Sequence, residues 1–203
     1  MENIEISDPL FRAAVTALDE GETATLKQLL QDNSRLAGVR LDKPTEGYFK
    51  HPYLLWFIAD NPIRRGRLHP NIPTIATVVI EAIRRDAPES LQQQIDYALV
   101  VAAFYGRSSM LPLLMTPDID LNNYPPANGG FHTHATALHQ AVWSGSLETV
   151  KLLVEAGADT SATDRVYKGT PLGWALYAQT EDEMSDEQKA NYARIADYLQ
   201  QKE

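Results

Sequence analysis

The stretch ALHQAVWSGSLETVKLLVEAGAD, residues 137–159, constrains the fold more than any other part of this 203-residue chain. Apolar side chains recur over residues 138–142 at the three- and four-residue spacing of one helix face. Gly145 interrupts the pattern, which then resumes over residues 147–154. We therefore predict two short helices that form a hairpin around a glycine turn.

The ends of this predicted hairpin carry residues suited to begin and end helices. We expect Thr136 to cap the first helix through its hydroxyl, and Gly157 to permit the left-handed turn that ends the second. A two-helix unit exposes an apolar face on each side, which only a neighbouring unit can cover. The stretch therefore predicts stacked helical units.

Self-similarity along the chain indicates where the neighbouring units lie. The segment TPLGWA, residues 170–175, aligns with TALHQA, residues 136–141, and residues 99–120 align in part with residues 138–159. Self-similarity at a nearly fixed period is typical of a solenoid.

TALHQA and TPLGWA, with GSLETVKLLVEAGAD after the first, resemble the ankyrin repeat family, whose signature is T-P-L-H-x-A. The resemblance implies an all-α ankyrin-repeat solenoid of divergent, bacterial-type repeats, in which about five helix-turn-helix units form a single domain over residues 1–203. The expected units are residues 8–37, 51–85, 94–122, 132–163 and 164–203. The expected inserted loops are residues 38–50, 61–72, 123–135 and 180–191.

Composition restricts the class of partner and the cellular compartment. The chain has 18 Lys and Arg against 27 Asp and Glu, and its formal charge of −9 disfavours nucleic acid and anionic lipid as partners. The absence of cysteine excludes disulfides, thiolate metal sites and cysteine nucleophiles. The start, MENIEISDPL, lacks the pattern of a secretion signal, and the longest apolar run, residues 97–105, is far shorter than the roughly 20 residues of a membrane span. We expect a soluble, cytoplasmic protein.

Aromatic residues at equivalent repeat positions are the best candidates for a partner-binding surface. Phe104, Trp143 and Tyr177 align with one another at the end of a first helix, where the resemblance implies that they face the concave groove. Tyr105 and Tyr167 extend this set, and rigid aromatic side chains dominate binding hot spots. The alternative is that these rings only pack over neighbouring repeats. The candidate contact residues are Phe104, Tyr105, Trp143, Tyr177, Tyr167 and Lys168.

Histidines and charged runs suggest other sites, for most of which a structural role is the simpler interpretation. His132 and His134 have the H-x-H spacing of a metal site but no nearby carboxylate, and for His139 the resemblance implies a structural, hydrogen-bonding role. The segment 181–189 is acidic and is expected to form a solvated face or a helix extension, because it lacks the glycine of a calcium loop. We therefore expect no metal site.

The segment NPIRRGRLHP, residues 61–70, concentrates positive charge in a predicted loop. Arg64, Arg65 and Arg67 could bind a phosphate or carboxylate through their guanidinium groups, or the loop could brace the next helix. The resemblance makes the bracing role equally plausible, because such a loop occurs in bacterial ankyrin-like proteins.

The chain lacks the motifs of serine hydrolases, zinc proteases and nucleotide-binding loops. We therefore expect a non-catalytic protein without a cofactor, which binds another protein of unknown identity through its concave face. The alternatives are an acidic regulatory or inhibitory protein that neutralises a basic enzyme or toxin, and a binder of anions or small ligands that uses the Arg64, Arg65 and Arg67 loop.

Overall fold

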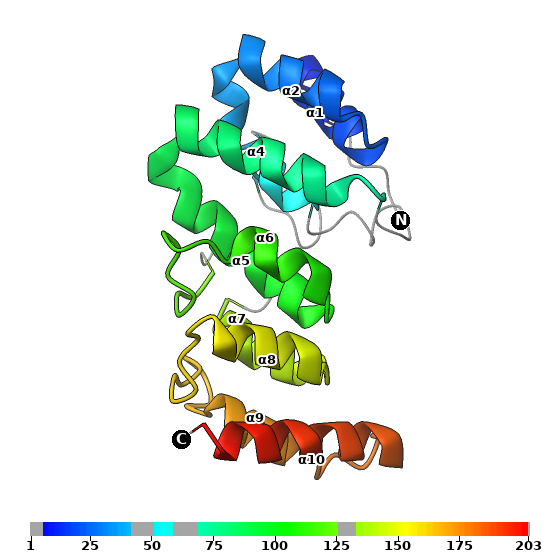
Figure 1. Ribbon diagram of the computed structural model, residues 1–203, viewed down its shortest axis with the longest axis vertical. Helices are drawn as coiled ribbons and strands as arrows, with labels where there is room; N and C mark the ends of the chain where they lie inside the picture. The colour runs from blue at the N-terminus through cyan, green and yellow to red at the C-terminus, as the bar shows by residue number, and fades with distance from the viewer. Residues whose placement is uncertain (1–5, 42–50, 59–68, 126–132, 203) are drawn as a thin grey trace. The chain divides into compact units, whose positions relative to one another are not determined.

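The computed structural model describes residues 6–41, 51–58, 69–125 and 133–202. These residues are helical apart from turns, loops and one isolated antiparallel bridge between Arg40 and Tyr53. The chain divides into two compact units (Figure 1). Unit 1 comprises residues 1–98 and 127–131, and unit 2 comprises residues 99–126 and 132–203.

Unit 1 is built from antiparallel helices around an apolar core. Its elements are α1 (Pro9–Asp19), α2 (Thr23–Asp32), the 3-10 helix η1 (Ser34–Ala37), a helical segment at residues 54–58, α4 (Ile72–Asp86), η2 (Pro88–Ser90) and the first part of α5 (Leu91–Phe104). The carboxylate of Asp8 caps α1, and Gly21, with φ +72°, makes the turn into α2. Helix α2 packs against both α1 and α4.

Unit 2 contains the helical hairpin predicted for residues 137–159. Its elements are the end of α5, η3 (Ser108–Met110), α6 (Leu111–Leu114), α7 (Ala137–Trp143), α8 (Leu147–Glu155), α9 (Pro171–Ala178) and α10 (Asp186–Gln200). Helix α7 packs against α8 and α9, and α10 packs against α9 and α8 (Figure 1). Each hairpin therefore covers a face of the next, as the two-helix argument requires.

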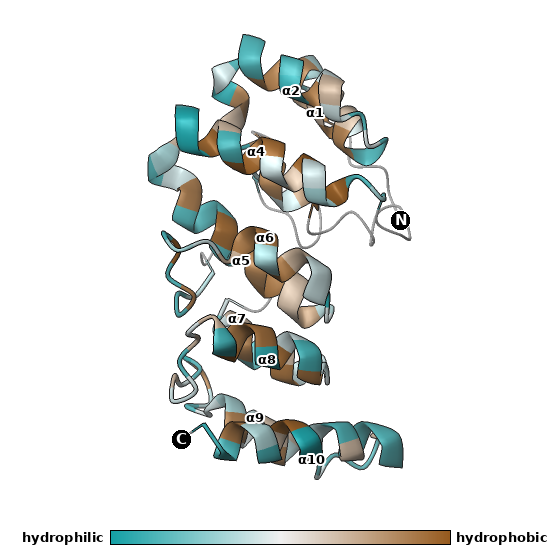
Figure 2. Cartoon of the chain, viewed as in Figure 1, coloured by the Kyte–Doolittle hydropathy of each residue, from teal (hydrophilic) through white to brown (hydrophobic). Residues whose placement is uncertain are grey.

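Apolar side chains of unit 2 are buried between its helices, and Figure 2 marks the hydrophobic residues along these helices in brown. Burial of a Leu or Val side chain contributes roughly 1.5–3 kcal/mol, so a few such residues hold each pair of helices together. The buried side chains are Leu138, Ala141, Val142, Val150, Leu153, Ala175, Ile195, Ala196 and Leu199.

The turns follow the predicted glycines. Gly145 and Gly157 have φ values of +69° and +99°, in the left-handed region that glycine adopts without strain. Within the segment expected to be an inserted loop, helix α10 begins at Asp186. A capping box between Ser185 and Gln188 starts it there, so part of the acidic segment is a helix extension. Within the described ranges, no helix is both long and apolar enough to span a membrane.

Candidate functional site

The loop before α9 is organised by one buried carboxylate. Asp164 accepts hydrogen bonds from the backbone N–H groups of Val166, Tyr167 and Gly169 at 2.9, 2.6 and 2.9 Å. Its second oxygen also accepts the indole N–H of Trp174 at 3.0 Å. Burial opposes ionisation of this group, but the four hydrogen bonds outweigh it and lower the pKa of Asp164. The carboxylate thus ties the loop to a ring of α9.

His139 connects the start of α7 to the same loop. Its ring is fully buried, with Nδ1 2.8 Å from the Thr136 hydroxyl and Nε2 3.0 Å from the carbonyl oxygen of Gly169. Because a carbonyl only accepts, Nε2 carries the proton, and in the neutral ring Nδ1 accepts from Thr136. Burial is the main cause of the lowered pKa of His139. The hydrogen-bonding structural role expected for His139 is confirmed.

The expectation for Thr136 was wrong in one respect. Thr136 occupies the N-cap position of α7, but its hydroxyl makes no bond to a backbone N–H of that helix. The physical reason is the competing partner, since the hydroxyl is turned toward the imidazole of His139 three residues later.

Trp174 is the centre of the aromatic surface, and sequence reasoning missed it. Its ring lies 5.1 Å from that of His139, 6.0 Å from that of His134 and 6.2 Å edge-on from that of Trp143. The signal was present in TPLGWA, where Gly-Trp replaces the His-Gln of the preceding unit. Gly169 permits the approach, because a Cβ there would come within 3.0 Å of the Trp174 ring.

Three of the predicted contact residues join Trp174 in unit 2. Tyr167 is 77% exposed, and its ring lies 6.1 Å from that of His134. Tyr177 follows Trp174 by three residues on α9, hence on the same helix face, and is 60% exposed. Trp143 is 36% exposed. We call Trp143, Tyr167, Trp174 and Tyr177 the aromatic cluster.

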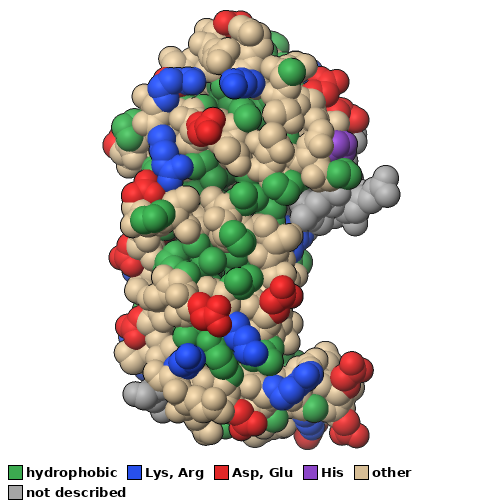
Figure 3. All heavy atoms as spheres, in the orientation of Figure 1, with side chains coloured by type: hydrophobic (Ala, Val, Ile, Leu, Met, Phe, Trp, Pro, Cys, Tyr) green, Lys and Arg blue, Asp and Glu red, His purple; other side chains and the backbone are tan. Residues whose placement is uncertain are grey.

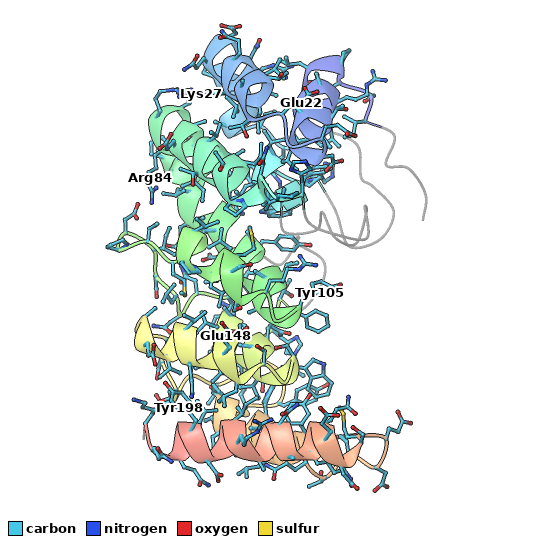
Figure 4. The ribbon with its side chains drawn as sticks, turned by 45° about the vertical axis from the view of Figure 1, so that its right-hand side comes forward. Glu22, Lys27, Arg84, Tyr105, Glu148 and Tyr198 are labelled. Atoms are coloured by element: carbon cyan, nitrogen blue, oxygen red, sulfur yellow. The ribbon has the colours of Figure 1, made fainter. Side chains whose placement is uncertain are left out.

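The other predicted contact residues, Phe104, Tyr105 and Lys168, also lie in unit 2. Phe104 is half-buried and packs edge-on against Tyr105, with ring centroids 5.0 Å apart, while Tyr105 itself is 44% exposed and projects beyond the end of α5 (Figure 4). Lys168 has a positive φ of +58°, and its ammonium group donates to the carbonyl of Arg165 at 3.1 Å. The chain just after Phe104 and Tyr105 lies beside the turn that follows Trp143, because a Cβ at Gly106 would come within 3.2 Å of Ser146 and 3.6 Å of Ser144.

Helix α10 positions the end of α7 that carries Trp143. The buried Tyr192 donates its hydroxyl to the backbone carbonyl of Trp143 at 2.8 Å. Burial raises the pKa of this phenol. The Trp143 backbone is therefore held by Tyr192 of α10, while the Trp143 ring remains partly exposed to solvent.

Carboxylates adjoin the aromatic cluster. Glu181 raises the pKa of the Tyr177 phenol, chiefly through a side-chain hydrogen bond. Figure 3 shows acidic side chains gathered where α10 begins. We call residues 181–187 the acidic loop; its carboxylates belong to Glu181, Asp182, Glu183, Asp186 and Glu187.

The remaining candidates from the sequence are the arginine loop and the histidine pair. Arg64, Arg65, Arg67 and His132 lie outside the described residues. His69, near the end of the segment 61–70, packs on Gly21, where a Cβ would come within 2.1 Å of its ring. In the part of the chain that the structure describes, no three His, Cys, Asp or Glu side chains gather closely enough to hold a metal ion.

Comparison with known proteins agrees with this architecture. Residues 76–164 match a family model described as "Ankyrin repeats (3 copies)". This segment therefore consists of ankyrin repeats, and the predicted all-α ankyrin fold is confirmed. Such repeats generally mediate interactions between proteins and are generally non-catalytic.

Curated proteins with similar segments are much longer than the region of similarity. The chain is 46% identical over 70 residues to "Zinc finger CCCH domain-containing protein 24" of Oryza sativa subsp. japonica, which covers 32% of this chain and 8% of that protein. It is 32% identical over 99 residues to "Ankyrin repeat and SOCS box protein 6" of Homo sapiens and of Pongo abelii, which covers 48% of this chain and 22% of those proteins. The chain thus spans less than a quarter of the length of these relatives.

Proposed function

We propose that this chain is a non-catalytic binding protein that holds a partner protein against the concave face of its repeats, with the aromatic cluster at the centre of the contact. We expect it to act in the cytoplasm. We also expect it to bind neither nucleic acid nor membrane, because its formal charge of −9 repels phosphate groups.

The observation that carries this proposal is the combination of exposure and support in one group of rings. Tyr167, Trp143 and Tyr177 expose large apolar surfaces, yet the backbone beneath two of them is held by Asp164 and Tyr192. Aromatic side chains on a preorganised backbone lose little conformational entropy on binding. Rings that served only to pack neighbouring repeats would be buried, as Trp56 and Tyr97 are in unit 1.

Site-specific crosslinking tests the proposal. Tyr177 is replaced by the photo-crosslinking residue p-benzoylphenylalanine in the full chain, and the same replacement at the exposed Asp197 of α10 is the matched control. We expect a discrete crosslinked protein from position 177 that is absent at position 197 and that unlabelled wild-type protein displaces. Equal crosslinking from both positions, or none from position 177, would contradict the proposal.

A second candidate is an acidic regulatory or inhibitory protein that neutralises a basic enzyme or toxin. The exposed carboxylates of the acidic loop favour it, because a negative surface accelerates association with a positive partner. Its test is the association rate of the crosslinked partner at two salt concentrations. A steep fall in the rate at high salt supports this candidate, and an unchanged rate excludes it.

A further inference from the structure

Other tyrosine rings of unit 2, one exposed and two partly exposed, have cations of the same chain over them. The guanidinium of Arg107 lies 4.6 Å from the ring centre of Tyr105, and that of Arg165 lies 4.0 Å from the ring centre of Tyr124. The ammonium groups of Lys151 and Lys202 lie 5.6 and 5.5 Å from the ring centre of Tyr198. No cation from the described residues lies over a ring of the aromatic cluster.

The carboxylates beside the aromatic cluster are likewise without a cationic partner in the described part of the chain. Elsewhere, Asp8 pairs with Arg35 at 2.9 Å and Asp86 pairs with Arg85 at 2.6 Å. Residues 181–190 contain five carboxylates and one cation, Lys189, which forms no ion pair with them. The acidic loop is therefore a region of uncompensated negative charge.

The acidic loop and the aromatic cluster form one surface. The backbone N–H and the hydroxyl of Thr180 donate to the carbonyl oxygen of Tyr177 at 2.8 and 2.7 Å, so the acidic loop begins at the turn that follows Tyr177. The capping box of Ser185 and Gln188 holds the far end of the loop at the start of α10. The two cations nearest to Tyr167 in the sequence make other contacts. Lys168 donates to the carbonyl oxygen of Arg165, and the guanidinium of Arg165 lies over the ring of Tyr124. An incoming cation would therefore meet both π faces and carboxylates.

We propose that the partner segment bound by the aromatic cluster carries an arginine, whose guanidinium stacks on the rings of Trp174 and Tyr177 and pairs with carboxylates of the acidic loop. Arginine fits better than lysine, because a planar guanidinium stacks on a ring and binds a carboxylate with two N–H groups at once. This inference rests on the proposed function and adds the chemistry of the partner.

The probe is a synthetic twelve-residue peptide of Gly and Ser with three arginines, compared with the same peptide containing citrulline, which has the shape of arginine without its charge. Binding to the full chain is followed through the indole N–H signals of Trp143 and Trp174 in NMR. We expect saturable shifts with the arginine peptide, and affinity at least about tenfold lower with citrulline. Equal shifts with both peptides, or no saturable shift below about 10 mM peptide, would overturn the proposal.

Two triple variants with equal changes in net charge separate a local effect from a general one. Asp182→Asn, Glu183→Gln and Glu187→Gln together remove three of the five carboxylates of the acidic loop, and Glu148→Gln, Glu155→Gln and Asp197→Asn remove three exposed carboxylates on α8 and α10. We expect the first variant to weaken the arginine peptide by at least about fivefold and the second by less than about twofold. Equal losses in the two variants would show a general charge effect and overturn the proposal.

The acidic-loop variant, used together with alanine substitutions of Trp143 and Tyr177, distinguishes failure of this inference from failure of the proposed function. If the crosslinked partner depends on Trp143 and Tyr177 but binds the acidic-loop variant as tightly as wild type, the arginine is wrong and the binding surface stands. If the partner depends on none of these residues, the proposed function itself fails.

Discussion

The side chain of Asp164 accepts four hydrogen bonds beneath the candidate surface. Its two oxygens accept three backbone N–H groups of the loop that carries Tyr167 and also the indole N–H of Trp174. Charge-assisted bonds of this kind are stronger than neutral ones. The exposed rings therefore depend on a buried carboxylate beneath them.

Replacing Asp164 by Asn should lower the free energy of unfolding by about 2–3 kcal/mol, because an amide cannot accept all four hydrogen bonds. Urea unfolding measures the change. Asp182→Asn, a like substitution at an exposed position, should change the free energy by less than about 0.5 kcal/mol. Equal stability of the two variants would contradict the role given to Asp164.

His139 makes the stability of unit 2 depend on pH. Because burial lowers its pKa in the folded state below the ordinary value of 6.5, the unfolded chain takes up the proton first as the pH falls. The stabilisation is therefore complete above pH 6.5 and is lost as the pH falls through the folded pKa. We expect the melting temperature to decrease between about pH 7.5 and pH 5.5, and the decrease to be smaller in His139→Gln. An identical pH dependence in both proteins would contradict this account.

At the scale of the element, the turn that ends α8 depends on a backbone conformation and not on space. Gly157 has φ +99°, and a Cβ there would meet no atom within 4 Å. Gly157→Ala should therefore cost about 1 kcal/mol through backbone strain alone, and Gly157→Asn should cost less, because Asn tolerates the left-handed region better. Chemical denaturation of the two variants measures this order. A larger loss with Asn would show that packing, and not the backbone, decides the turn.

The elements of the central hairpin are predictable from the sequence because they depend on local chemistry. Periodic apolar residues predict α7 and α8, and Gly145 and Gly157 predict their turns. The start of α10 inside the acidic segment follows from Ser185 and Gln188, a local capping signal that a comparison of repeats overlooks. Local signals thus define these helices better than the alignment of repeats does.

Side-chain contacts between elements are less predictable. The hydroxyl of Thr136 has two possible partners, a backbone N–H and the His139 ring, and only the packed structure decides between them. Trp174 joins Trp143, His134 and His139 because Gly169 leaves room for its ring, a relation between residues of different elements. The sequence could therefore predict Trp143 and Tyr177 as candidates, but not the ring of Trp174 that contacts Trp143.

At the scale of the whole molecule, the exposed apolar surface is unevenly distributed. Among the described residues, the large hydrophobic side chains that are 36% exposed or more belong to unit 2; they are Tyr105, Trp143, Val166, Tyr167, Leu176 and Tyr177. The aromatic residues described in unit 1 are instead packed together, as in the stacked rings of Trp56 and Tyr97 at 4.1 Å. This division assigns partner binding to unit 2 in our proposal.

The measurement that tests the central claim most directly is the affinity of the crosslinked partner for three full-length proteins. These are the wild type, the double variant Trp143→Ala and Tyr177→Ala, and the control Tyr198→Ala, whose ring is covered by two lysines on another part of unit 2. We predict that calorimetry shows at least about a 30-fold loss of affinity in the double variant and less than about a threefold loss in the control, with both proteins folded. Unchanged affinity in the folded double variant would contradict the account.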